Sequence, residues 1–401
     1  MALIMANKNK VYTHAIPVII FVGGFTNNVI PTLILFLKNT QGINTTYAML
    51  LQCLLFTSYF VTLIPSTMLI QRFGYQRTLT FASLFCSISC LMIALIMYLN
   101  QNTYLYGAVF LLAFGITLLR LTVTPLLVAI RGDSNYHRTI SRIMTADTIG
   151  ALLSPTLSAL WILNTTPDIW FCPWVFFILM ALAMVGVGVK CQQTELATQT
   201  NNHHITIDGI YQSLQHRDIF RGSIATFTFI GIEFSIPVFI GLLVNEQPQQ
   251  SFLSPTSMIS SYWTLILAGR IISITLLRYF KPHTMIVAGS LSAIAITLFS
   301  IALFPDHLAV FLISLGLCNA YMFPCIFSIY TKRLPTELHY YASSIFLLAF
   351  AGGAVIPMLQ SHLANHIGII NSFILTIVCY FLLILTITTE RSPRGVELES
   401  T

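Results

Sequence analysis

Long apolar runs separated by short polar segments dominate the chain. A membrane-spanning helix requires about 20 predominantly apolar residues, and runs of this kind occur twelve times in the sequence. These candidate spans cover residues 15–37, 46–70, 79–98, 104–130, 140–163, 170–190, 222–244, 255–279, 284–304, 307–331, 340–363 and 369–388. The pattern therefore predicts an all-α integral membrane protein with twelve transmembrane helices in two six-helix domains.

The predicted domain boundaries follow from the longest polar gap, which separates the first six spans from the last six. We expect an N-terminal domain at 1–190, a cytoplasmic linker at 191–221, a C-terminal domain at 222–388 and a cytoplasmic tail at 389–401. A faint internal repeat supports pseudo-symmetric halves, because residues 69–78 and 276–284 each combine a helix end, a short basic turn and a new helix start. Two such halves are typical of secondary transporters.

Composition excludes several classes of protein. Only 8% of the 401 residues are charged and 56% are hydrophobic, whereas soluble domains carry about 25% charged residues. So few charges could not cover a soluble surface, which excludes an ordinary soluble enzyme, a disordered chain and a nucleic-acid-binding protein. The eight cysteines lie mostly in apolar runs, without disulfide or zinc spacing, and are expected to be small buried residues. The first apolar run is long enough to span, so we interpret it as a helix and not as a cleaved signal peptide.

Basic residues are distributed unevenly around the predicted spans. Sixteen of the 19 Lys and Arg residues fall on one side of the membrane, Lys38 falls on the other, and Arg120 and Arg270 lie within spans. Because cytoplasmic segments carry an excess of Lys and Arg, we expect a multi-pass protein of the cell inner (plasma) membrane with both termini in the cytoplasm. The net charge of +6 is then largely a consequence of topology.

Four charged residues lie well inside the predicted spans: Arg120, Asp147, Glu233 and Arg270. A charge at this depth costs about 2.5–3.5 kcal/mol on insertion scales, so each is a candidate functional residue. Counting along the helices at about 1.5 Å per residue places Arg120 level with Asp147, and Glu233 level with Arg270. The pairs either fix helix packing only, or face a central cavity. In a cavity, Asp147 and Glu233 are our candidates for proton coupling, and the arginines would bind a polar or anionic group.

Polar and aromatic residues at similar depth complete the candidate solute site. The predicted substrate-binding residues are Asn27, Asn28, Gln52, Tyr59, Arg120, Arg270, Asn319 and Tyr321. Amides hydrogen-bond hydroxyl groups, and aromatic rings stack on the apolar face of a sugar. Each of the uncharged residues could instead form an interhelical hydrogen bond. Tyr262 and Trp263 fit either this site or the aromatic belt at the membrane surface, and Gly352-Gly353 permits close helix contact or flexing.

Several motifs are similar to those of a known family. They are Tyr-Phe-Val-Thr-Leu-Ile-Pro at 59–65, Gln-Arg-Phe-Gly-Tyr-Gln-Arg at 71–77, Gly-Ile-Glu-Phe-Ser-Ile-Pro-Val-Phe at 231–239, Ala-Gly-Arg at 268–270, Gly-Leu-Cys-Asn-Ala-Tyr-Met-Phe-Pro-Cys-Ile-Phe-Ser at 316–328 and Gly-Gly-Ala-Val-Ile-Pro at 352–357. These motifs resemble the fucose–galactose–glucose:proton symporters of the major facilitator superfamily. The resemblance implies the twelve-helix major facilitator fold and proton-driven sugar uptake by alternating access. Glu233, Arg270, Asn319 and Pro324 match the family pattern.

The chain also departs from the family at positions that bear on proton coupling. The family has an acid where this chain has Val29, a glutamate in span 4 where it has Arg120, and an asparagine in span 5 where it has Asp147. The acid of the superfamily loop motif is replaced by Gln71. The proton site has therefore moved or the coupling has changed. Arg120 favours a solute bearing a carboxylate or phosphate, or an internal bridge to Asp147.

These observations predict a secondary active transporter that works by proton-coupled symport of a small polar solute, with a sugar as the default. The alternatives are an importer of an anionic solute bound through Arg120, such as an organic acid, amino acid or carboxylate siderophore, and an exporter. An enzyme is not expected, since His203-His204 lie in the polar linker without metal-site spacing. We expect no cofactor beyond the proton gradient. The expected partners are the solute, protons and the lipid bilayer, with no nucleic acid, and the protein is expected to be a monomer.

Overall fold

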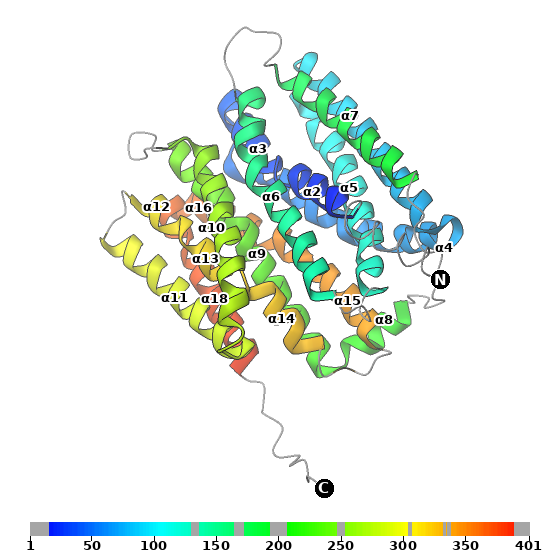
Figure 1. Ribbon diagram of the computed structural model, residues 1–401. Coiled ribbons are helices and arrows are strands. Elements are labelled where there is room, and N and C mark those ends of the chain that lie inside the picture. The colour runs from blue at the N-terminus through cyan, green and yellow to red at the C-terminus, as the bar shows by residue number, and fades with distance from the viewer. Residues whose placement is uncertain are drawn as a thin grey trace.

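The computed structural model describes residues 16–129, 136–163, 172–192, 207–246, 253–303, 307–331, 334 and 338–388. All secondary structure in these residues is helical (Figure 1). The first half contains α2 (Ile16–Asn27), α3 (Ile30–Gln41), α4 (Thr45–Tyr98), the 3-10 helix η2 (Asn102–Tyr104), α5 (Leu105–Ala129), α6 (Tyr136–Ile162) and α7 (Pro173–Gln192).

The second half begins after a short helix, α8 (Ile207–Leu214), which lies in the predicted linker. It contains α9 (Arg217–Glu246), α10 (Pro255–Leu276), α11 (Pro282–Leu303), α12 (Leu308–Ile313), α13 (Leu315–Asn319), α14 (Met322–Thr331), α15 (Leu338–Leu348), η6 (Ala349–Ala351), α16 (Gly352–Ile367), α17 (Ile369–Ser372) and α18 (Ile374–Thr388). The polar residues 193–206 and the tail after 388 lie outside the described residues.

Nine helical stretches in the described part of the chain are long and apolar enough to cross a membrane. They are Ile16–Thr40, Arg72–Tyr98, Leu105–Val123, Pro173–Gln192, Arg217–Glu246, Pro282–Leu303, Leu308–Thr331, Ser344–Ile367 and Ile369–Thr388. The other three predicted spans coincide with the beginning of α4, with α6 and with α10. These three are helical as expected.

Four predicted spans are interrupted. In span 12, α17 ends at Ser372 and α18 begins at Ile374, and in the other three a proline or glycine stands close to the interruption. In span 1, α2 ends at Asn27 and α3 begins at Ile30, because Pro31 has no N–H to donate to the Asn27 carbonyl. In span 10 the breaks around Asn319 precede Pro324. Span 11 passes from α15 through η6 into α16 at Gly352. Broken helices at membrane depth place polar backbone inside the bundle, where partners can satisfy it.

Spans 2 and 3 are joined by a sharper turn than the sequence suggests. Helical structure runs through the predicted basic turn at 69–78 and is interrupted only at Gly74, which has φ 77° and ψ 169°. Glycine adopts a positive φ without a steric penalty. The Thr78 hydroxyl donates to the Gly74 carbonyl at 2.8 Å, which stabilises the start of the next helical segment.

Each half packs mainly on itself, and selected helices join the halves. In the first half, α4 packs on α5 and α7 and α2 packs on α6; in the second, α9 contacts α10, α16 and α18. Between the halves, α4 contacts α16, α3 contacts α9, and α6 lies against α10 (Figure 1). The exact domain limits stay predictions.

Polar contacts close the interface at one end of the bundle. Lys38 Nζ of α3 lies 2.6 Å from Glu246 Oε1 of α9, and Asn39 and Asn245 exchange side-chain hydrogen bonds of 3.2 and 2.9 Å. The Asn365 amide of α16 donates to the Thr46 hydroxyl of α4. We call these the closing contacts. They lie at the end that the distribution of basic residues predicts to be outside.

Candidate functional site

Arg120 of α5 and Asp147 of α6 form an ion pair, as their matched depth predicted. Arg120 Nη2 donates to Asp147 Oδ1 at 2.8 Å, a distance typical of a charge-assisted hydrogen bond. Their side chains are 19% and 26% exposed. The pair is therefore partly buried within the bundle.

Asp147 is positioned by a close approach of α2 to α6. A Cβ atom on Gly24 would lie 2.5 Å from the Asp147 carbonyl oxygen, so only glycine fits at this contact. One turn further on, the Asn28 side chain donates to the Gly24 carbonyl at 2.9 Å and satisfies part of the interrupted helix end. Asn27 Oδ1, at the same break, is buried and has no hydrogen-bond partner among the described residues.

Glu233 of α9 and Arg270 of α10 form a looser pair. Arg270 Nη2 lies 4.0 Å from Glu233 Oε1, and the Glu233 side chain is only 9% exposed. Arg270 Nη1 donates to the hydroxyl of Thr148, which follows Asp147 on the opposite half. The depth match again predicted the pair, but the shared contact with the other half was not predicted.

The four residues form one charged cluster, which we define as Arg120, Asp147, Glu233 and Arg270. Asp147 and Arg120 are close enough to act electrostatically on Glu233, although they belong to the other half. Tyr59 of α4 lies close enough to Arg120 to interact with it electrostatically. The charged cluster therefore spans the boundary between the halves.

Aromatic rings from both halves meet beside the charged cluster. The Phe56 and Phe234 ring centroids are 4.8 Å apart in an edge contact, and Phe234 lies 5.9 Å from Trp263. Tyr59 contacts Phe350 of η6 at 5.5 Å. We call these five residues the aromatic seam. Edge and tilted ring contacts of this kind are favourable.

Two buried polar atoms near the aromatic seam lack partners in the described part of the chain. They are Gln52 Oε1, one helical turn before Phe56, and Trp263 Nε1. An unsatisfied buried acceptor and donor are costly, so groups supplied by a bound solute would stabilise them. Tyr262 and Trp263 are 0% and 4% exposed, which places them inside the bundle and not in an aromatic belt at the membrane surface.

Two predicted solute-binding residues lie outside this arrangement. The Asn319 amide donates to Tyr262 Oη at 2.9 Å and its carbonyl accepts from Tyr380 Oη at 2.7 Å, so it links α13 to α10 and α18. Tyr262 in turn donates to the Glu233 carbonyl at 3.4 Å. Tyr321 points instead toward α11, where its hydroxyl donates to the Met285 carbonyl at 3.4 Å. Direct solute contact by either residue stays a prediction.

Thr148 and the phenylalanines of the aromatic seam were not among the predicted site residues. Thr148 directly follows Asp147 and Phe234 directly follows Glu233, so adjacency to a buried charge was the available signal. Phenylalanines that face lipid and those that face the other half look alike in an apolar run, because both environments favour apolar side chains.

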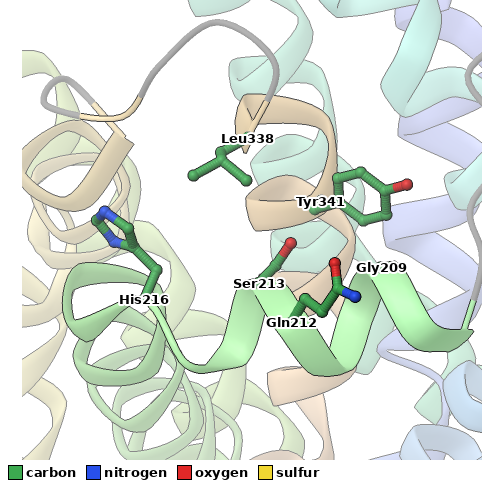
Figure 2. A pocket seen from close by; sticks show the side chains of 6 residues that line it. All are labelled: Gly209, Gln212, Ser213, His216, Leu338 and Tyr341. Atoms are coloured by element: carbon green, nitrogen blue, oxygen red, sulfur yellow. The ribbon is translucent and has the colours of Figure 1, made fainter.

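A cavity of about 310 Å³ lies away from the charged cluster, between α8 and α15 (Figure 2). Its lining residues are Gly209, Gln212, Ser213, His216, Leu338 and Tyr341. None of them belongs to the predicted site. Groups of three or more His, Cys, Asp or Glu residues that could hold a metal ion were not found in the described residues.

Comparisons with known proteins agree with the fold. A family model described as Major Facilitator Superfamily matches residues 16–357. The glucose/galactose transporter of Brucella abortus is 26% identical over 386 residues, covering 91% of this chain and 90% of that protein. The L-fucose-proton symporter of Escherichia coli K12 is 23% identical over 342 residues, covering 77% of each protein. The crystal structure of the transporter FucP in the outward conformation superimposes with a TM-score of 0.68 at 18% identity, covering 95% of this chain and 99% of that one.

Proposed function

The chain belongs to the Major Facilitator Superfamily, and on that premise we propose that this multi-pass membrane transporter is a proton-coupled symporter of a small polar solute. A hexose is the first candidate, because the relatives with matching length are named for glucose, galactose and fucose. Transport would proceed by alternating access, with the charged cluster and the aromatic seam between the two halves as the central site. The proton gradient would supply the energy.

The observation that carries this proposal is the charged cluster. It places two carboxyl groups, Asp147 and Glu233, in the boundary between the halves, each beside an arginine. A carboxyl group can exchange a proton when the strength of its arginine contact changes. Such a change is expected when a solute binds or when the halves move, and it would link proton uptake to solute uptake.

The surroundings suit an uncharged, hydroxylated solute. Gln52 Oε1 can accept and Trp263 Nε1 can donate a hydrogen bond, and the rings of the aromatic seam offer apolar faces. Arg120 already contacts Asp147 and Tyr59. Its charge is thus compensated from within the protein, which favours a neutral solute over the anionic solute considered from the sequence.

Uptake by purified protein in liposomes tests this function. Glucose, galactose, fucose, carboxylates and amino acids are screened first by thermal stabilisation and then by uptake with and without an inward proton gradient. We expect at least one hexose to be accumulated only with the gradient. Asp147→Asn should abolish accumulation and preserve solute exchange. Accumulation of a carboxylate that is lost in Arg120→Gln would instead identify the anionic function, and accumulation independent of the gradient would exclude symport.

We also propose that the protein lies in the inner (plasma) membrane as a monomer with both termini in the cytoplasm. The support is the distribution of basic residues, with Lys38 the single base on the predicted outer side. Labelling of intact cells with an impermeant thiol reagent tests this orientation. A cysteine introduced at Gln101, between α4 and α5, should react, and one introduced at Arg278, after α10, should not.

A further inference from the structure

Two polar contacts connect α6 of the first half to α10 of the second. Thr156 Oγ1 lies 2.7 Å from Ser260 Oγ, and Arg270 Nη1 donates to Thr148 Oγ1. The helices run antiparallel, since the higher residue number on α6 pairs with the lower one on α10. Both contacts require α6 and α10 to lie side by side, so both must break if the halves separate here.

Arg270 is shared between a hydroxyl of one half and a carboxyl of the other. Its distance from Glu233 is 4.0 Å, whereas the neighbouring pair Arg120–Asp147 is at 2.8 Å. The Arg270 guanidinium therefore lies closer to Thr148 than to Glu233. Thr148 itself is buried, with an exposed fraction of only 1%. An arginine stabilises the ionised form of a carboxyl less when it lies farther away.

The other groups near Glu233 have little net effect on whether its carboxyl is ionised. Asp147 and Arg120 face Glu233 from the opposite half with opposite charges, and their mutual contact makes their effects largely cancel. The Tyr262 hydroxyl of α10 donates to the backbone oxygen of Glu233 and not to its carboxyl. The position of Arg270 is thus the variable that can alter proton binding at Glu233.

We propose that Thr148 is a positioning residue that links proton binding at Glu233 to the contact between α6 and α10. While the helices are in contact, Thr148 holds Arg270 away and the Glu233 carboxyl carries a proton. When Arg270 leaves Thr148 and moves onto Glu233 while the outer end is still closed, an ion pair forms, and the proton leaves the carboxyl oxygen for water on the inner side. This inference rests on the proton-coupled symport proposed above, for which it supplies the link between chemistry and movement.

Thr148→Val tests the link, because it removes the hydroxyl and keeps the shape. With Arg270 always free to approach Glu233, half-maximal uptake should shift to lower pH by about one to two units, the size expected for a hydrogen bond to a charged group. Thr148→Ser keeps the hydroxyl and should keep the wild-type profile. Thr156→Val is the matched control, since it removes the other contact between the same helices and should leave the pH profile in place.

A second measurement follows Glu233 without transport. In a variant with Trp161, Trp170 and Trp174 replaced by Phe, the remaining Trp263 contacts Phe234, the neighbour of Glu233. Its fluorescence in detergent should show a pH transition that disappears in Glu233→Gln and moves to lower pH in Thr148→Val.

The two measurements separate the two proposals. Wild-type uptake that ignores the proton gradient, together with a fluorescence transition that moves in Thr148→Val, would exclude symport and support the role of Thr148. Uptake that follows the gradient, together with an unchanged profile and transition in Thr148→Val, would overturn the role of Thr148 and leave symport standing. An equal shift in Thr156→Val would also overturn it, because any loosening of α6 from α10 would then suffice.

Discussion

At the scale of single residues, the charged cluster shows how a membrane protein keeps ionised side chains in its interior. Each arginine has an acid on the adjacent antiparallel helix, at 2.8 Å in one half and 4.0 Å in the other. Removing one member leaves the other without its compensating charge, which is more costly than never having introduced the pair. The cluster should therefore tolerate paired neutralisation better than single neutralisation.

The first prediction compares Arg120→Gln, Asp147→Asn and the double variant. Each single change should lower thermal stability in detergent, at a cost of about 3 kcal/mol for a buried pair that loses one partner. The double variant should recover most of the loss, because no uncompensated charge remains. Arg278→Gln, at an exposed position after α10, is the control and should leave Tm unchanged. Additive losses in the double variant would show that the two residues do not stabilise each other.

Depth counting predicted both ion pairs because the rise of a helix is constant and consecutive spans are antiparallel. The same counting could not predict Thr148, since its contact with Arg270 depends on how the halves approach each other. Asn319 was predicted as a solute ligand from its polarity and its depth. Both ends of its amide contact tyrosines of its own half, and its contact with the solute stays a prediction.

At the scale of helices, small residues determine which elements can meet. A Cβ atom on Gly353 of α16 would lie 2.6 Å from Phe56 Cζ of α4, so a ring of the first half packs directly on a glycine of the second. Close helix contact and flexing were both predicted as alternatives for Gly352-Gly353. The structure shows close contact at both, since a Cβ on Gly352 would overlap the Phe227 carbonyl of α9.

The second prediction is that Gly353→Ala impairs transport by pushing Phe56 away from α16. We expect slower uptake with normal insertion in the membrane, because the added methyl group acts on the contact between halves. Phe56→Leu in the same chain should restore part of the rate by making room. Gly186→Ala on α7 is the matched control, as a Cβ there meets no atom within 4 Å. An unchanged rate in Gly353→Ala would mean that this contact is not used in the cycle.

At the scale of the whole molecule, the closing contacts join the halves at one end. Lys38–Glu246, Asn39–Asn245 and Thr46–Asn365 each pair a first-half residue with a second-half residue. Alternating access requires one end to be shut while the other is open. The repeated pattern of spans predicted the two halves, and the distribution of basic residues predicted their orientation. Which end is closed depends on contacts between distant segments and has no local signal in the sequence.

The third prediction concerns Asn39→Cys combined with Asn245→Cys, in a background from which the eight native cysteines have been removed. A short bifunctional thiol reagent should join the two positions and stop uptake, because the halves could no longer part at this end. A reducible spacer should allow recovery on reduction. The single-cysteine variants treated with the same reagent should retain their rate. Full transport by the joined protein would show that these contacts stay together throughout the cycle.

The charged cluster has a further consequence that is electrical. Its two arginines and two acids sum to zero when all four are ionised, so the protein itself carries no net charge across the membrane at this site. A hexose and one proton would then move one positive charge per cycle, and a membrane potential of 100 mV would contribute about 2.3 kcal/mol to each turnover. A monocarboxylate with one proton would move none. The current produced on adding solute to a voltage-clamped membrane therefore distinguishes a neutral cargo from an anionic one.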